Sequence, residues 1–290
     1  MAVAAKIALP ELYPSAINHT RKLLGQAFEH GTLSIELVQA IATVVFFVDA
    51  DDNSGARKLA YAIRGASELG LFKRVTAYPQ DLLEARKVLN RERTWIYLMI
   101  ADHRFSTQRS LPRMIPPEQR RQDTNTWIHQ HVLSCPCPSE AGLAPLGGIA
   151  KLLDLYEVLV TPSRAFDGPD EAVLACLESE FASWVGDWAG DQTRIHLQPV
   201  QIKLIRLYAR AFRYQIDEVH LIIAVASRAV EATKVKAITA FRTVIRSALD
   251  VLEYLREILG STACVWESAF IAAASTCKST LLLGGVEAPC

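Results

Sequence analysis

Residues 85–112, ARKVLNRERTWIYLMIADHRFSTQRSLP, form the stretch that decides the fold of this chain. The stretch has the pattern of one long helix that runs into a polar loop. Steps of three and four residues along it place five side chains on one helical face: Val88, Glu92, Trp95, Met99 and Asp102. A flanking row contains Leu89, Arg93, Ile96, Ile100 and His103. Charged side chains therefore lie within an apolar stripe, which predicts a polar network inside a helical core.

The two carboxylates of this stripe, Glu92 and Asp102, are expected to have partners. A buried carboxylate without a partner is costly, so each should meet a donor or a cation. The arginines proposed for this role are Arg64, Arg93, Arg104 and Arg113. With no nucleophile or metal motif nearby, the network is interpreted as architectural. We therefore expect Trp95→Ala or Asp102→Ala to impair folding rather than one chemical step.

The composition is that of a globular protein with no overall charge. The chain has 290 residues, 50% of them hydrophobic, which allows one large domain or two small ones. Lys plus Arg and Asp plus Glu both number 31, so the formal net charge is zero. A neutral chain has no general attraction for nucleic acids or anionic membranes. We expect neither direct DNA contact nor membrane association.

The cysteines and the terminal segments indicate an intracellular compartment. The six cysteines are scattered without a C-x-x-C pair, which is typical of free thiols in a reducing environment. The segment MAVAAKIALPELYP is interrupted by Lys6, Pro10 and Pro14 and does not resemble a signal peptide. The most apolar run, 262–283, contains Glu267 and Lys278 and is predicted to be a buried helix rather than a membrane span. The expected compartment is the cytoplasm or the nucleus.

Periods of three and four residues dominate the whole sequence, which predicts an all-α fold. We expect a multi-helix bundle or a solenoid-like array of antiparallel helices. Ser34 is predicted to cap a helix, and Gly31 and Gly70 are predicted to end helices. The predicted helices are 15–30, 33–48, 56–69, 80–104, 118–133, 149–160, 170–188, 199–214, 216–233, 236–259 and 262–283.

A Pro/Gly-rich segment at residues 134–148 is the predicted linker. It separates an N-terminal helical part, residues 1–133, from a C-terminal helical part, residues 149–290. The two parts are expected to form one continuous domain.

An acidic string, Asp49-Ala50-Asp51-Asp52, is the first candidate for chemistry. In helical terpene cyclases of the protonating class such a string supplies the catalytic acid, and other helical prenyl enzymes use Asp clusters to bind magnesium diphosphate. The competing interpretation is a solvated turn between two helices. No second acidic metal-binding string follows in the sequence, so the turn is favoured.

Four residues with metal-binding side chains, His129, His131, Cys135 and Cys137, are the second candidate. Structural zinc sites usually have longer separations between ligand pairs, and the intervening prolines extend the chain, so a surface helix end is favoured over zinc. The sequence contains no G-x-S-x-G, G-x-G-x-x-G or P-loop motif. A basic cluster of Arg109, Arg113, Arg120 and Arg121 is diluted by neighbouring acids, which favours a solvated loop.

Two ordered motifs resemble a known family. One is Ala62-Ile63-Arg64-Gly65-Ala66-Ser67-Glu68-Leu69-Gly70-Leu71. The other runs from Arg91-Glu92-Arg93-Thr94-Trp95 through Asp102 and Arg104 to Arg109-Ser110-Leu111-Pro112. Together they resemble the fungal-specific transcription factor domain, the middle homology region of the zinc-cluster regulators. The similarity covers about residues 33–131. The positions that carry the family pattern are Arg64, Glu92, Arg93, Trp95, Asp102, Arg104 and Pro112.

The resemblance implies a non-enzymatic regulatory domain in transcription. His103 is inserted into the family's Asp-Arg pair, Ser110-Leu111 replaces the loop glycine, and the six-cysteine DNA-binding cluster is missing. We therefore expect no cofactor in this chain, with zinc confined to the absent cluster. Expected partners are proteins of the transcription machinery, a second copy of the chain, or a small-molecule inducer. The expected location is the nucleus, or the cytoplasm for a stand-alone fragment. The alternative is a helical enzyme of terpene cyclase or prenyl type that uses Asp49, Asp51 and Asp52.

Overall fold

The computed structural model describes residues 2–47, 52–75, 77–109, 111–120, 127, 143–160, 171–190, 199–226 and 232–261. These residues form nine α-helices and two short 3-10 turns, and they contain no strand. The all-α prediction is confirmed. Of the described residues, 2–120 belong to one compact unit and 127–260 to a second.

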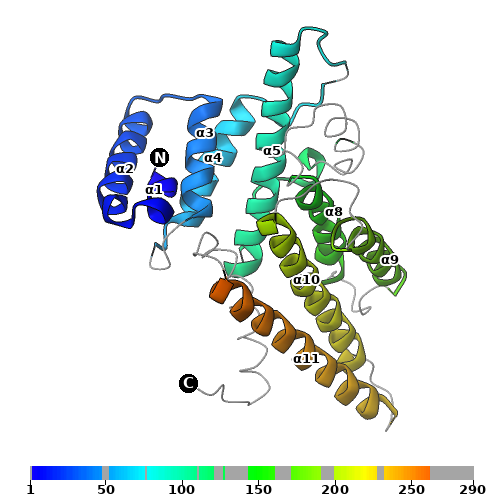
Figure 1. Ribbon diagram of the computed structural model, residues 1–290. Helices are drawn as coiled ribbons and strands as arrows, with labels where there is room; N and C mark the ends of the chain where they lie inside the picture. Colours follow the sequence, from blue (N-terminus) through cyan, green and yellow to red (C-terminus); the bar gives the residue numbers. More distant parts are fainter. Residues whose placement is uncertain are drawn as a thin grey trace. The chain divides into compact units, whose positions relative to one another are not determined.

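The helices of the first unit run from α1 to α5 (Figure 1). The longest is α5, which corresponds to the long helix predicted at residues 80–104. Within this unit α5 packs against both α3 and α4. The elements are α1 (Ala2–Ala8), η1 (Pro10–Leu12), α2 (Tyr13–Glu29), α3 (Ile35–Phe46), α4 (Gly55–Glu68), α5 (Leu82–Arg109) and η2 (Pro117–Gln119).

Local chemistry sets the ends of these helices as predicted. The Ser34 hydroxyl accepts a hydrogen bond from the Leu37 N–H at 3.2 Å and so caps the start of α3. Gly70 has a φ of 67° and ends α4. The Gly70 N–H donates to Ser67 O and the Leu71 N–H to Ala66 O, which is the Schellman pattern. Gly31 ends α2 with the same geometry, at a φ of 63°.

Helices α3 and α4 lie side by side (Figure 1). At Gly65 of α4 an added Cβ atom would lie 3.6 Å from Val38 Cγ2 of α3. A Cβ atom at Gly65 would lie 2.7 Å from Leu33 Cδ1. The small residues Ala62 and Ala66 are buried on the same helix. The small residues of α4 therefore allow this close packing.

Helix α5 is buried on nearly all sides between Thr94 and Ser106. Its largest buried side chain, Trp95, is fully enclosed. The helix ends at Arg109 rather than at Arg104 as predicted. The reason is that Phe105 is buried and continues the apolar stripe, while no glycine or proline interrupts the helix before Pro112.

The second unit contains α8 (Leu143–Val160), α9 (Glu171–Trp188), α10 (Pro199–Ala226) and α11 (Ala232–Ser261). Helices α8 and α9 lie side by side, and α10 packs against both (Figure 1). The Phe181 and Phe212 rings stack with centroids 5.7 Å apart and join α9 to α10. The Trp184 indole N–H donates to the Pro145 carbonyl at 2.9 Å and joins α9 to the first turn of α8.

Three further predicted boundaries are wrong. Residues 199–226 form one helix instead of two, because no glycine or proline separates Tyr214 from Ile216. The linker extends less far than predicted, because α8 already begins at Leu143 and tolerates Pro145 in its first turn. No helix begins at Glu118, because residues 117–119 form a 3-10 turn and Arg120 is extended. None of the helices in the described ranges is long and apolar enough to cross a bilayer.

Candidate functional site

The polar network predicted around α5 is present, and the buried Asp102 carboxylate connects the helix to the loop that follows it. Asp102 accepts the Ile115 N–H at 2.9 Å and the Met114 N–H at 3.0 and 3.1 Å. Burial raises the pKa of Asp102, while these N–H donors and the charges of Arg113 and Arg120 act against that rise. The carboxylate therefore attaches the loop after α5 to the middle of the helix. Its role is architectural in this geometry.

Glu92 and Arg91 connect α5 to the segments that precede it. The buried Glu92 carboxylate accepts a hydrogen bond from the Tyr78 hydroxyl. The Arg91 guanidinium donates to the carbonyl of Leu69 at 3.0 Å and to that of Gly70 at 3.4 Å. A cation at the last carbonyls of a helix also complements the helix dipole. Arg91 thus attaches α5 to the C-terminal end of α4.

An amide bridge joins α3 to α5. The Gln39 amide nitrogen donates to Asn90 Oδ1 at 3.0 Å and to Thr94 Oγ1 at 2.8 Å. The Thr94 hydroxyl in turn donates to the Asn90 carbonyl at 2.7 Å. These contacts satisfy polar groups between packed helices and define how the two helices align.

The four arginines proposed as carboxylate partners have different surroundings. Arg64 lies on the surface with 78% of its side chain exposed and pairs with Glu68, so its assignment to the buried network is wrong. Arg113 acts on Asp102 through its charge, as proposed. Arg104 places its guanidinium 4.8 Å from the centre of the Phe46 ring. Arg93 is half-buried.

The two remaining family positions are Trp95 and Pro112. The Trp95 indole N–H donates to the Gln119 carbonyl at 2.9 Å, and its ring lies 6.0 Å from that of Phe72. Pro112 is exposed in the loop after α5. The inserted His103 is buried, and burial together with the charges of Arg113 and Arg120 lowers its pKa to about 3. His103 is therefore neutral at pH 7.

Of the acidic string, Asp52 lies in the described turn before α4, whereas Asp49 and Asp51 lie outside the described residues. Asp52 accepts the Lys58 ammonium at 2.6 Å and both the N–H and the hydroxyl of Ser54. Burial favours the neutral acid, but these donors outweigh it and lower the pKa of Asp52 to about 2. An acid that stays ionised at neutral pH is poorly suited to donate a proton. This turn also lines an open pocket of about 670 Å³, together with residues of α2, α3 and α4.

The zinc candidates His129, His131, Cys135 and Cys137 lie outside the described residues. Among the residues that are described, no group of three His, Cys, Asp or Glu side chains has a geometry that could hold a metal ion. The zinc interpretation of these four residues stays a prediction.

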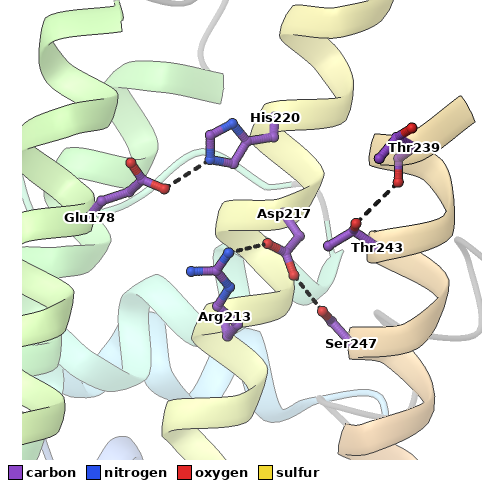
Figure 2. Close-up of polar contacts among 7 residues, drawn as sticks. All are labelled: Glu178, Arg213, Asp217, His220, Thr239, Thr243 and Ser247. Carbon is purple, nitrogen blue, oxygen red and sulfur yellow. Dashed lines mark hydrogen bonds and ion pairs between the residues drawn. The ribbon is translucent and has the colours of Figure 1, made fainter. Parts of the chain in front are cut away.

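A second polar layer, which the sequence reasoning missed, is centred on α10. Asp217 is buried, accepts the Ser247 hydroxyl of α11 and pairs with Arg213 at 2.9 Å (Figure 2). His220 contacts Glu178 of α9 at 2.9 Å, as Figure 2 also shows. Ser247 therefore bonds to a carboxylate rather than to a histidine, which differs from the order of a serine-histidine-acid triad.

The same turn of α10 also reaches α8. Glu218 accepts the Tyr156 hydroxyl at 3.4 Å. Burial raises the pKa of Glu218, and hydrogen bonds from Tyr156 and Tyr214 act in the opposite direction. Asp217, Glu218 and His220 thus connect α10 to three helices. Two adjacent carboxylates between the buried Ile216 and Val219 were the sequence signal for this layer.

The comparisons with known proteins indicate a distant fungal homologue. Protein priB of Lentinula edodes is 27% identical over 184 residues, which is 60% of this chain. The matched part spans 32% of the length of that protein. No protein-family model matches the chain, and no solved structure matches it.

Proposed function

We propose that this chain is a regulatory domain of a fungal transcription regulator. It acts without catalysis and without a cofactor, and it contacts proteins or a small inducer rather than DNA. Its place of action is the nucleus. The family-like positions of α4 and α5 and the distant homology to a fungal protein support this proposal.

The observation that carries the proposal is how the motif residues are used. Trp95 and Asp102 bind backbone groups of the segment after α5, and Arg91 binds the end of α4. In an enzyme, the polar side chains of such a network converge on a space where substrate can bind. Here these side chains bond to the protein backbone instead. This supports a domain that functions through its surface rather than through an internal site.

The proposal is tested by joining the full chain to an unrelated DNA-binding module in yeast. A reporter gene with sites for that module measures transcription, both from a silent and from an already active promoter. We expect a change of at least threefold in one direction relative to the module alone. The matched variants are Asp102→Ala, which is expected to abolish the effect, and Asp187→Ala at an exposed position, which is expected to retain it. An unchanged reporter at both promoters, with the fusion folded and nuclear, would contradict the proposal.

The alternative is a helical enzyme that acts on an isoprenoid or another hydrophobic substrate. The ion pair between Asp52 and Lys58 opposes the protonating type of such an enzyme, because the paired carboxylate is held in its ionised form. A magnesium-dependent diphosphate release assay separates the two functions, with Asp52→Ala as the control. Release by the intact chain that disappears in this variant would favour the enzyme.

A further inference from the structure

Helix α11 carries an apolar stripe that is partly open to solvent. Ile238 is 53% exposed and Leu249 is 48% exposed. The half-buried Ile245 and Leu252 continue the stripe, because spacings of three, four and seven residues place side chains on one helical face. The α11 stripe is defined by these four residues. Apolar surface of this kind gains free energy when another molecule removes it from water.

The α11 stripe faces away from α10. The Ser247 hydroxyl of α11 donates to Asp217 of α10, as Figure 2 shows. The Tyr254 ring of α11 lies 3.9 Å from the Arg210 guanidinium of α10. Side chains two positions apart in a helix point about 200° from each other. Apart from Ile238, every residue of the stripe is two positions from Ser247 or Tyr254 and therefore lies on the opposite side of α11.

Exposed charges accompany the α11 stripe in a symmetrical order. Arg242 and Arg246 precede Leu249, and Glu253 and Glu257 follow it on the same flank of the helix. The successive spacings of these four charges are four, seven and four residues. The pattern is therefore the same from either end, with the sign of the charge reversed.

This order of charges selects a second copy of α11 in the antiparallel direction. If the two helices cross between residues 249 and 250, Arg246 of one copy lies opposite Glu253 of the other, and Arg242 lies opposite Glu257. A parallel pair would place Arg246 beside Arg246, which is repulsive. Exposed ion pairs contribute little to affinity, so burial of the stripe provides the attraction and the charges set the direction.

The length of α11 is sufficient for such a pairing. The helix has 30 residues, which corresponds to about 45 Å. Arg256 is also exposed and lies on the side of the stripe, so it marks the end of the apolar surface. The contact is therefore centred on Ile245, Leu249 and Leu252, with the arginine and glutamate pairs beside them.

We propose that α11 is a self-association surface through which two copies of this chain pair in antiparallel orientation. The α11 stripe of one copy packs against the stripe of the other, with Leu249 close to the two-fold axis. This inference does not rest on the proposed function, because it depends only on the stripe and on the order of its flanking charges.

The first test measures the oligomeric state of the full chain by sedimentation equilibrium. We expect a reversible dimer that Leu249→Glu weakens at least tenfold, because the introduced carboxylates meet near the axis. Leu23→Glu on α2 is the matched control, since Leu23 is 51% exposed, and it should dimerise like wild type. A wild-type monomer at every concentration would overturn the proposal, and so would an unweakened Leu249→Glu dimer. A monomer that Leu249→Glu destabilises would show that another segment of the same chain covers the stripe.

The second test reverses the flanking charges at low ionic strength. Arg246→Glu and Glu253→Arg are each expected to weaken the dimer at least tenfold, because each variant places like charges across the interface twice. The double variant is expected to recover the wild-type affinity, and a mixture of the two single variants is expected to form a heterodimer. Both positions are exposed, and circular dichroism checks that each variant is folded. A double variant that dimerises as weakly as the single variants would overturn the antiparallel pairing.

Discussion

Asp102 in the middle of α5 accepts a hydrogen bond from the backbone N–H of Ile115 at 2.9 Å. Both residues are buried, and the adjacent Met114 N–H donates to the same carboxylate. Alanine at position 102 would replace the carboxylate with a methyl group and leave these N–H donors without an acceptor. The loop after α5 is therefore expected to depend on this one carboxylate.

Substitution of Asp102 should destabilise the protein in two steps. Asp102→Asn keeps one acceptor oxygen and should lower the free energy of unfolding by about 1 kcal/mol, and Asp102→Ala should lower it by about 3 kcal/mol. Urea unfolding followed by circular dichroism measures both, with the exposed Asp187→Ala as control. Equal stabilities of wild type and Asp102→Ala would refute the architectural role.

Trp95 separates the contribution of a hydrogen bond from that of packing. Trp95→Phe removes the indole N–H that binds the Gln119 carbonyl but keeps an aromatic ring, so we expect a loss of about 1 kcal/mol. Trp95→Ala also leaves a cavity in a fully enclosed position and should cost about 4 kcal/mol. Thermal unfolding of the two variants measures the difference. A Trp95→Ala protein with an unchanged melting temperature would be incompatible with this packing.

His103 should make stability depend on pH below neutrality. The folded protein keeps it neutral because its pKa is lowered from 6.5 to about 3, so the unfolded state binds more protons between these values. Its contribution is complete above pH 6.5 and is lost as pH falls, by about 1.4 kcal/mol per pH unit. The pKa of Asp102 is raised, so its effect on the pH dependence of stability has the opposite sign. Asp102 is present in both wild type and the His103 variant, so its effect cancels when the two are compared.

The test for His103 is the difference between two curves of unfolding free energy against pH. His103→Gln cannot titrate, so it should lose less stability than wild type between pH 6.5 and 4. Parallel curves over that interval would show that His103 accepts a proton in the folded state.

Asp52 should make the free energy of unfolding depend on pH in a more acidic interval than His103 does. Its pKa is lowered from 3.8 to about 2, so its contribution is complete above 3.8 and is lost as pH falls toward 2. The full effect corresponds to about 2 kcal/mol, because the side chain is 14% exposed and bound to Lys58. Asp52→Asn should therefore flatten the stability curve in this interval. Acid unfolding monitored by circular dichroism checks it, and an unchanged midpoint would argue against the ion pair.

Two glycines in helix interiors should respond in opposite ways to alanine. Gly25→Ala meets open space and should raise the free energy of unfolding by about 0.8 kcal/mol through helix propensity. Gly65→Ala places its methyl group 2.7 Å from Leu33 Cδ1, so repacking should cancel or exceed that gain. Denaturant unfolding of both variants gives the comparison. A larger gain at Gly65 than at Gly25 would contradict the packing of Leu33, just before α3, against α4.

The sequence determined the helical class, the place of α5 and most helix ends in the first unit. These depend on local chemistry: the apolar spacing of residues 88–103, the Ser34 hydroxyl and the left-handed Gly70 act within one or two turns. The same spacing indicated that Glu92 and Asp102 would be buried and bonded. The continuous α10 and the full length of α5 were not predicted. In both places the sequence has no glycine or proline to break the helix, and that absence should have counted for more than the expected break.

Only the tertiary structure decided which groups meet. Asp102 accepts hydrogen bonds from backbone N–H groups 12 and 13 residues away, with the charges of Arg113 and Arg120 acting on it as well, and Arg64 lies at the surface. The pocket and the polar layer of α10 join side chains from three helices or more, and their contacts depend on how those helices cross. Helical periodicity assigns a residue to a face, but the identity of its neighbour is set by the packing of another helix against that face.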